Sequence, residues 1–267
     1  MSRAAGFVTG GSSGIGLELA RAMAVRGQDV AIFARDASRL DDARTILHAA
    51  AAHGTRVRSF ACDVTDRAAL TAAVDTAIAE LGSPSHAIAA AGIATPGLFT
   101  EQDPVVHDQH MAVNYTGSRD FVAAVLPSMT ARGAGRIGLI SSAAAYFGIY
   151  GYSAYAPSKF AVRALAEVLT LELAPLGISV THIAPPDTDT PMLTAENRTK
   201  PAASREITKA GGLWRPEQVA ARTLAAMDRG RPEAPIGAQT AALARLSSVL
   251  APVLRGWQAR VIRRHGG

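Results

Sequence analysis

The sequence has a single cysteine and no apolar run suited to crossing a membrane. Cys62 has no second cysteine to pair with, which excludes an internal disulfide and fits a reducing compartment. The longest uncharged stretch, residues 137–158, contains glycine, serine, tyrosine and Pro157, so we predict no transmembrane span. An apolar run begins at Ala4, and we expect no secretory leader before it. These absences predict a cytoplasmic protein.

Acidic residues are absent from the end of the chain, whose formal net charge is +5. The basic residues there are Arg255, Arg260, Arg263 and Arg264. A helix within residues 238–267 places an apolar stripe on one side: Leu243, Leu246, Leu250, Val253, Leu254, Trp257 and Val261. This basic amphipathic tail either contacts the cytoplasmic face of a membrane peripherally or packs on protein, with a kink at Pro252. No recognisable nucleic-acid motif accompanies it, so we expect no nucleic-acid partner.

Short apolar runs alternate with longer helical patterns over most of the chain. We predict strands over residues 6–10, 29–34, 56–61, 86–92, 135–141 and 178–184. We predict helices over residues 15–26, 37–52, 67–81, 105–126 and 153–173. This alternation predicts a parallel sheet with helices on both faces. Residues 1–237 are therefore expected to form one Rossmann-like, doubly wound α/β domain that binds its ligands at the carboxyl ends of the strands.

A glycine-rich segment, TGGSSGIG, joins the first predicted strand to the first helix. Gly10 permits a tight turn, Gly14 lets the backbone approach a pyrophosphate, and Gly16 allows close packing of the helix on the sheet. The helix beginning near Ile15 offers free N–H groups to phosphate. The alternative is a merely flexible loop, which its position between a strand and a helix disfavours. The predicted cofactor residues here are Thr9, Gly10, Ser12, Ser13, Gly14, Ile15 and Gly16.

The residues after the second strand concern the choice of cofactor. An acid at this position usually meets a free ribose 2′-hydroxyl, whereas a 2′-phosphate needs a cation. Ala34 occupies the acid position and Arg35 follows, so NADPH is favoured, although Arg35 is alternatively a surface arginine. After the third strand, Asp63 is placed to reach the adenine amino group, and Val64 follows it.

Three further residues form a candidate catalytic set. Tyr155 and Lys159 are four apart, so they share one face of a helix, and Ser142 ends the preceding strand. We expect the lysine ammonium to lower the pKa of the tyrosine and the serine to hold a carbonyl oxygen beside it. Such a set suits proton transfer to an oxygen while the neighbouring carbon receives hydride. A chance Tyr–Lys pair is the alternative, which the glycine loop and strand order disfavour.

These motifs together resemble the short-chain dehydrogenase/reductase family over residues 4–229. The resemblance implies that Tyr155 is the general acid, that Ser142 holds the substrate oxygen, and that Lys159 also binds ribose. It implies that Asn114, in VNY, holds a water that relays protons to Lys159. Two segments depart from the family pattern. Residues 89–92 read AAAG, which keeps Gly92 for close cofactor approach, and residues 185–186 read PP, with Thr188 and Thr190 kept as cofactor contacts.

The segment that leaves the last predicted strand, PPDTDTPMLTAENRTKP, is rich in proline, and we expect neither strand nor regular helix in it. It begins a substrate loop over residues 185–212 and is similar to the corresponding loop of 3-ketodihydrosphingosine reductases. That resemblance implies NADPH-dependent reduction of 3-ketosphinganine to sphinganine in sphingolipid synthesis. We hypothesise that Asp187 or Asp189 meets the 2-ammonium of this long-chain amino-ketone lipid. The alternative is that these acids only cap or solvate the loop.

Other functions remain open at this point. The same catalytic residues suit a reductase of 3-oxoacyl thioesters, steroids or aldehydes, because they treat carbonyls alike. A noncatalytic NADP-binding protein is a more distant alternative. His107 and His110 have ligand-like spacing, but Asp108 is the sole further candidate, so we expect no metal. The family resemblance implies a homo-oligomer that associates through the helices before the fifth and sixth strands.

Overall fold

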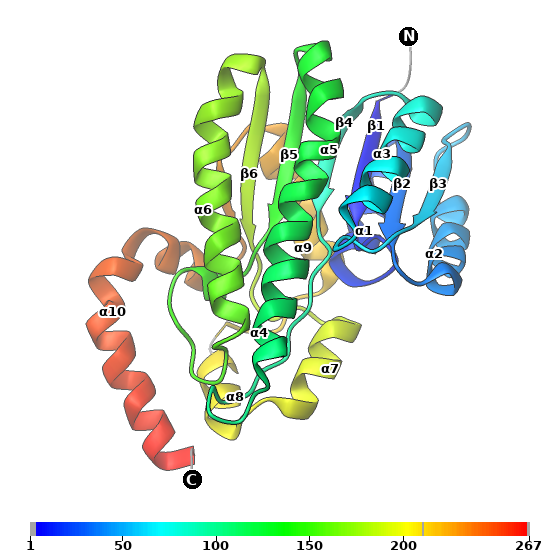
Figure 1. Ribbon diagram of the computed structural model, residues 1–267. Helices are drawn as coiled ribbons and strands as arrows, with labels where there is room; N and C mark the ends of the chain where they lie inside the picture. Colours follow the sequence, from blue (N-terminus) through cyan, green and yellow to red (C-terminus); the bar gives the residue numbers. More distant parts are fainter. Residues whose placement is uncertain (1–3, 210, 266–267) are drawn as a thin grey trace.

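Within the described residues, 4–209 and 211–265, a seven-stranded parallel sheet forms the centre of the molecule (Figure 1). Its strands are β1 (Ala5–Thr9), β2 (Asp29–Ala34), β3 (Val57–Ala61), β4 (Pro84–Ala89), β5 (Gly135–Ile140), β6 (Ile178–Ala184) and β7 (Glu233–Pro235). Their order across the sheet is β3-β2-β1-β4-β5-β6-β7. The six predicted strands are present, and the α/β fold class is confirmed. The sequence did not predict β7, because three residues ending in a proline give no strand pattern.

Helices cover both faces of the sheet. On one face lie α3 (Arg67–Leu81), α5 (Gly117–Arg132) and α6 (Tyr155–Leu173). On the other lie α1 (Gly14–Val25), α2 (Ala37–Ala50) and α9 (Pro216–Asp228). Consecutive β1 residues show that the strand is buried on both faces: Phe7 packs in the first layer and Val8 in the second, and neither is exposed.

The helical region predicted over residues 105–126 is longer and less regular than expected. It consists of α4 (Pro104–His110), a π-helical segment (Met111–Thr116) and α5, which continues through Pro127 to Arg132. The proline removes one helical hydrogen bond without ending the helix. The helix ends where Gly133 adopts a φ of +66°, which glycine allows.

The prediction that the proline-rich segment contains no regular helix is wrong. Two short helices follow β6: α7 (Pro191–Thr199) and α8 (Ala202–Lys209). Thr190 caps α7 by accepting a hydrogen bond from the Leu193 N–H, and Pro191 occupies the first turn. Proline is tolerated there because the amide it lacks has no helical partner at that position. Thr190 and Pro191 together set where α7 begins.

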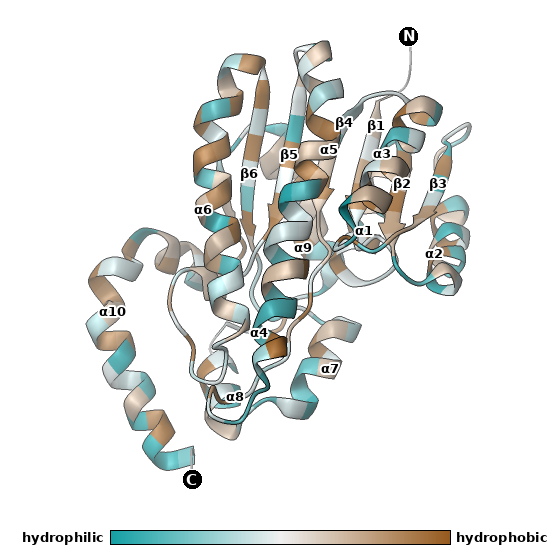
Figure 2. Ribbon diagram, viewed as in Figure 1, coloured by the Kyte–Doolittle hydropathy of each residue, from teal (hydrophilic) through white to brown (hydrophobic). Residues whose placement is uncertain are grey.

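The chain ends in α10 (Ala238–His265), which runs away from the sheet (Figure 1). Its first turns pack on the domain, and Leu243 is buried against Tyr146 and Ala184. Farther along, Gln258 donates to Gly148 O and accepts from the Tyr150 N–H. Apolar and polar residues mix along the exposed part of this helix (Figure 2). Nowhere in the described ranges does a helix combine the length and the hydropathy needed to cross a bilayer.

Candidate active site

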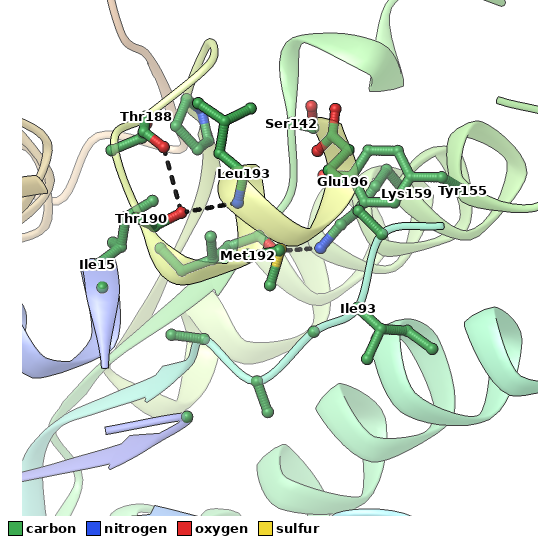
Figure 3. Close-up of a pocket in the computed structure, with 18 of the residues that line it drawn as sticks. Ile15, Ile93, Ser142, Tyr155, Lys159, Thr188, Thr190, Met192, Leu193 and Glu196 are labelled. Carbon is green, nitrogen blue, oxygen red and sulfur yellow. Dashed lines mark hydrogen bonds between the residues drawn. The ribbon is translucent and has the colours of Figure 1, made fainter. Parts of the chain in front are cut away.

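A cavity of about 1090 Å³ lies at the carboxyl ends of the strands. The glycine-rich loop forms one part of its wall, and the ends of β2, β4, β5 and β6 form others. α7 and the first two turns of α10 complete the wall, the latter through Gln239, Thr240 and Leu243. Among the described residues this cavity brings together most of the residues singled out in the sequence, and Figure 3 shows one part of it.

The glycine-rich loop is packed so closely that side chains would not fit. Gly10 and Gly14 have φ values of +66° and +54°, which favour glycine. A Cβ on Gly16 would lie 2.2 Å from Gly10 O. Ser13 precedes α1 without a side-chain cap, so the amides of the first turn at the cavity wall remain available. This geometry fits the predicted phosphate cradle.

Thr9 joins the glycine loop to the strand end that departs from the family pattern. Its hydroxyl oxygen accepts hydrogen bonds from the N–H groups of Ala90 and Ala91, at 3.1 and 3.2 Å. This contact ties β1 to the end of β4 without a polar side chain at position 90. The AAAG departure therefore leaves the two strand ends joined, with Gly92 lining the cavity.

The candidate 2′-phosphate region is open and contains two arginines, each beside an aspartate. Arg35 is 67% exposed in its side chain and lies 3.7 Å from a carboxylate oxygen of Asp63. Although partial burial raises it, hydrogen bonds from Thr65 and the charge of Arg35 hold the pKa of Asp63 below its usual value. The sequence analysis missed Arg39, which also lines the cavity here. Its position could have indicated this, because Arg39 lies four residues after Arg35, in the first turn of the next helix.

The predicted catalytic residues lie on adjoining elements. Tyr155 opens α6, and Lys159 follows one turn later with Nζ 5.5 Å from the centre of the tyrosine ring. Lys159 also donates to Ile140 O at the end of β5. Ser142 caps a short 3-10 turn after β5 and accepts from the Ala144 N–H. Figure 3 shows Ser142, Tyr155 and Lys159 at the same end of the cavity.

Burial dominates the electrostatics of this group. It raises the pKa of Tyr155, and the charge of Glu196 raises it further, while a hydrogen bond with Ser142 opposes both. The prediction of a lowered tyrosine pKa is therefore wrong for this arrangement. Burial also lowers the pKa of Lys159 to about 8. The tyrosine is protonated at neutral pH, which suits a proton donor, and the lysine loses its charge in mildly basic solution.

Asn114 lies in the π-helical segment and is fully buried. Its amide oxygen accepts from the Ile93 N–H at 2.8 Å, and its amide nitrogen donates to Ile93 O and to Ser158 Oγ. A Cβ on Gly92 would lie 3.1 Å from the Asn114 oxygen and 3.5 Å from Lys159 Nζ. Asn114 therefore holds the loop after β4 against α6, next to Lys159.

His110, considered above as a metal ligand, uses both ring nitrogens within the protein. Nδ1 lies 2.7 Å from Val106 O, and Nε2 accepts from the Thr95 N–H. The ring meets that of Tyr155 edge-on, with centres 6.3 Å apart. No group of three or more histidine, cysteine, aspartate or glutamate side chains in residues 4–209 and 211–265 is arranged to hold a metal.

The threonines after β6 hold α7 over the glycine loop. The Thr188 hydroxyl donates to Pro186 O, and the Thr190 hydroxyl donates to Thr188 O (Figure 3). A Cβ on Gly14 would lie 2.9 Å from Thr190 Cγ2. Thr188 and Thr190 both line the cavity. The glycine-rich loop and the segment that follows β6 therefore meet at this point.

The two predicted substrate acids occupy different settings. Asp187 is partly buried and accepts from Lys200 Nζ at 3.3 Å, whereas Asp189 is exposed. Sequence reasoning missed two residues of the same wall, Tyr152 and Glu196, and Lys200 beside them. All three are buried, and both the tyrosine hydroxyl and the lysine contact Glu196. Nothing in the sequence around Glu196 distinguishes it from a solvated helix acid.

Comparison with known proteins shows a family to which the sequence of this chain is similar. A family model described as short chain dehydrogenase matches residues 5–201. A Danio rerio protein named 3-dehydrosphinganine reductase is 39% identical over 215 residues, covering 80% of this chain and 65% of its own. A Mus musculus 3-ketodihydrosphingosine reductase is 35% identical over 92% of this chain and 75% of its own length. The match thus spans just under two thirds of the first relative.

Solved structures agree with the fold. An actinorhodin polyketide ketoreductase variant crystallised with NADPH has a TM-score of 0.78 and 27% identity, over 87% of this chain and 94% of that one. A levodione reductase has a TM-score of 0.81 over 91% of this chain and 99% of that one; its 22% identity supports the fold alone.

Proposed function

This chain belongs to the short chain dehydrogenase family, and from that premise we propose that it reduces 3-ketosphinganine to sphinganine with NADPH. The observation that carries the reaction is the meeting of Ser142, Tyr155 and Lys159 at one end of a cavity that also contains the glycine loop. The choice of substrate is supported by relatives named for this ketone and its synonyms in animals and plants.

The residues present fit NADPH. The close-packed glycines and free amides of Ser12 to Gly16 suit its pyrophosphate, Arg35 and Arg39 suit its 2′-phosphate, and Asp63 suits its adenine. We further assign Val64, Gly92, Thr188 and Thr190 to the cofactor wall and Lys159 to the ribose. Bound there, NADPH would supply hydride to the ketone carbon.

The protein's own residues supply positioning and a proton. Ser142 and Tyr155 hold the carbonyl oxygen, and Tyr155 donates its proton to that oxygen as negative charge develops on it. The charged Lys159 stabilises the phenolate that remains. Asn114 stays a proposed member of the path that returns a proton, through a water beside Lys159. Whether or not it takes part in that path, its side-chain amide orients the loop at Ile93.

A direct assay tests this function. NADPH oxidation is measured with detergent-dispersed 3-ketosphinganine, with a 3-oxoacyl thioester, and with NADH in place of NADPH. Fast turnover of the amino ketone with NADPH is expected, with NADH at least about tenfold poorer because Arg35 and Arg39 meet no phosphate. Preference for the thioester would overturn the substrate while leaving the catalytic residues assigned. Equal use of NADH would overturn the assignment of the two arginines.

The pH dependence of the reaction follows from Lys159. Its pKa is lowered to about 8, so the charged form is present below that pH and is lost above it. The value of kcat/KM for ketone reduction is therefore expected to be level near neutral pH and to fall above about pH 8. Initial rates across this range with NADPH measure it. A profile that rises through pH 8 would contradict the role given to the lysine charge.

We also propose that α10 contacts an anionic membrane surface, where a long-chain substrate resides. Three exposed apolar residues, Leu246, Val249 and Val253, lie on one side of the helix. Five arginines and no acids occur over Ala238–His265. We expect the native chain to sediment with vesicles that contain phosphatidylserine. The bound fraction is expected to fall several-fold for the double variant V249E/V253E. Equal sedimentation would reject the membrane role, while neutral vesicles separate apolar from electrostatic binding.

A homo-oligomer formed through the outer faces of α5 and α6 is a further proposal. α6 exposes Phe160, Val168 and Leu171, with fractions of 40%, 50% and 77%. Three such side chains on one helix are typical of a surface that a second subunit covers. Sedimentation velocity of the native chain measures the subunit number, and a monomer at micromolar concentration would reject the proposal.

A further inference from the structure

α7 directs a carboxylate toward the cavity. Glu196 is its only buried residue, with 9% exposed, while the other residues of Pro191–Thr199 are exposed or half-buried. A short surface helix ordinarily turns apolar side chains inward, so a buried glutamate requires partners. In Figure 3 the Glu196 carboxylate lies at the end of the cavity occupied by Ser142 and Tyr155.

Two donors hold this carboxylate, and both reach the same oxygen. The Tyr152 hydroxyl donates to Oε1, and Lys200 Nζ lies 3.1 Å from Oε1. Oε2 of Glu196 accepts no hydrogen bond from the described part of the chain. It is also not one of the polar atoms that are fully buried without a partner, so it is reachable from outside the protein. Oε2 is therefore held in position and open to a further donor.

Negative charge is in excess within the group formed by Glu196, Asp187 and Lys200. Lys200, 4% exposed, is shared between the carboxylates of Glu196 and Asp187, so one cation faces two anions. Tyr152 is neutral, because burial and the charge of Glu196 raise its pKa. The excess also reaches the catalytic group, since Glu196 and Asp187 both raise the pKa of Tyr155. Charge interactions are stronger in such an enclosed site than in water, so a bound cation is favoured there.

This charge lies close to the carbonyl-binding residues. The rings of Tyr152 and Tyr155 have their centres 5.9 Å apart, and the Tyr152 hydroxyl bonds to Glu196. In a 2-amino-3-ketone a single carbon separates the ammonium nitrogen from the carbonyl carbon. A carbonyl at Ser142 and Tyr155 therefore brings the ammonium group to the same part of the wall.

We propose that Glu196, oriented by Tyr152 and Lys200, accepts a hydrogen bond from the substrate ammonium and selects amino ketones over neutral ketones. This inference rests on the proposed function and names the residue that specifies its substrate class. It assigns to Glu196 the ammonium contact that the sequence analysis gave to Asp187 or Asp189. Tyr152, whose ring lies against that of Tyr155, bonds to Glu196 and not to Asp187, and Asp189 is exposed.

The test compares two ketones in the full-length chain. One is 3-ketosphinganine, and the other is the same ketone without its amino group. Glu196→Gln is expected to lower kcat/KM for the amino ketone by about 10–100-fold, the value of a charge-assisted hydrogen bond. The ketone without nitrogen should be reduced nearly as well by the variant as by the native chain. The preference for the amino ketone is thereby lost.

Two further variants separate recognition from folding. Tyr152→Phe keeps the carboxylate but removes one of the donors that orient it, so a smaller loss confined to the amino ketone is expected. Glu206→Gln is the matched control, because Glu206 lies on the next helix, pairs with Lys209, and does not line the cavity. It should leave both substrates unaffected. NADPH affinity, measured by fluorescence titration, should be the same in all three variants.

The outcomes distinguish the inference from the function on which it rests. Equal loss for both ketones in Glu196→Gln and in Tyr152→Phe, or an unchanged preference, overturns the role of Glu196. If the native chain still reduces the amino ketone, the proposed function stands. A native chain that prefers the ketone without nitrogen overturns both.

Discussion

Replacement of Tyr155 by phenylalanine is expected to lower kcat for ketone reduction by about 10²–10⁴-fold, the usual contribution of a general acid. In the proposed mechanism the hydroxyl donates to the carbonyl oxygen, and the ring that packs against Tyr152 and His110 is retained in the variant. Cofactor affinity should therefore hardly change. Stopped-flow measurement of NADPH oxidation, together with titration of NADPH binding, separates the two effects.

A nearby tyrosine provides the control for this variant. Tyr150 precedes α6 on the same segment, and its backbone rather than its hydroxyl bonds to Gln258. Tyr150→Phe should retain nearly native turnover. Persistent activity in Tyr155→Phe would show that Tyr155 is not the proton donor and that another group supplies the proton. Loss of NADPH binding in that variant would instead indicate a structural role for the phenol.

Gly16→Ala is expected to weaken NADPH binding at least about tenfold and to lower the melting temperature, because the methyl group overpacks the loop. The new Cβ would lie 2.2 Å from Gly10 O, a backbone atom that cannot rotate away. Overpacking commonly costs about 1–3 kcal/mol, and each kcal/mol lowers the melting temperature by roughly 2–4 °C in a domain of this size. Thermal unfolding with and without NADPH measures both effects.

Gly256→Ala is the matched control for the glycine loop. A Cβ at Gly256 meets nothing within 4 Å, and the residue lies inside α10. Alanine is the better helix former, so this variant should match or slightly exceed the native melting temperature. A Gly16→Ala variant that binds NADPH as the native chain does would contradict the close-packing argument.

The fold could be predicted because its signals are local. Most strands of the predicted set are short apolar runs, and longer helical patterns lie between them. The meeting of Ser142, Tyr155 and Lys159 could be predicted for a related reason: Tyr155 and Lys159 share one helix, and parallel strands bring their carboxyl ends to one edge. The glycine loop needs only its own spacing and a strand before it.

Glu196 could not be predicted in the same way. Its burial depends on Tyr152, 44 residues earlier in the chain, and its neighbours in α7 give no apolar pattern. The prediction that the pKa of Tyr155 is lowered was wrong for the same reason. The sequence shows the favourable lysine one turn away, but not the burial or the carboxylate that together raise the pKa. Contacts that set charge in this site come from distant segments.

The order of the strands has a consequence for how copies of this chain can associate. One outermost strand of the described sheet is β7, which has three residues and ends in Pro235. The other is β3, where Arg58 is exposed and pairs with Glu80. A proline, a charge and a short edge all oppose the addition of another strand. Continuous sheets across two subunits are therefore disfavoured at both borders, which leaves helix faces as the surfaces for self-association and limits edge-driven aggregation.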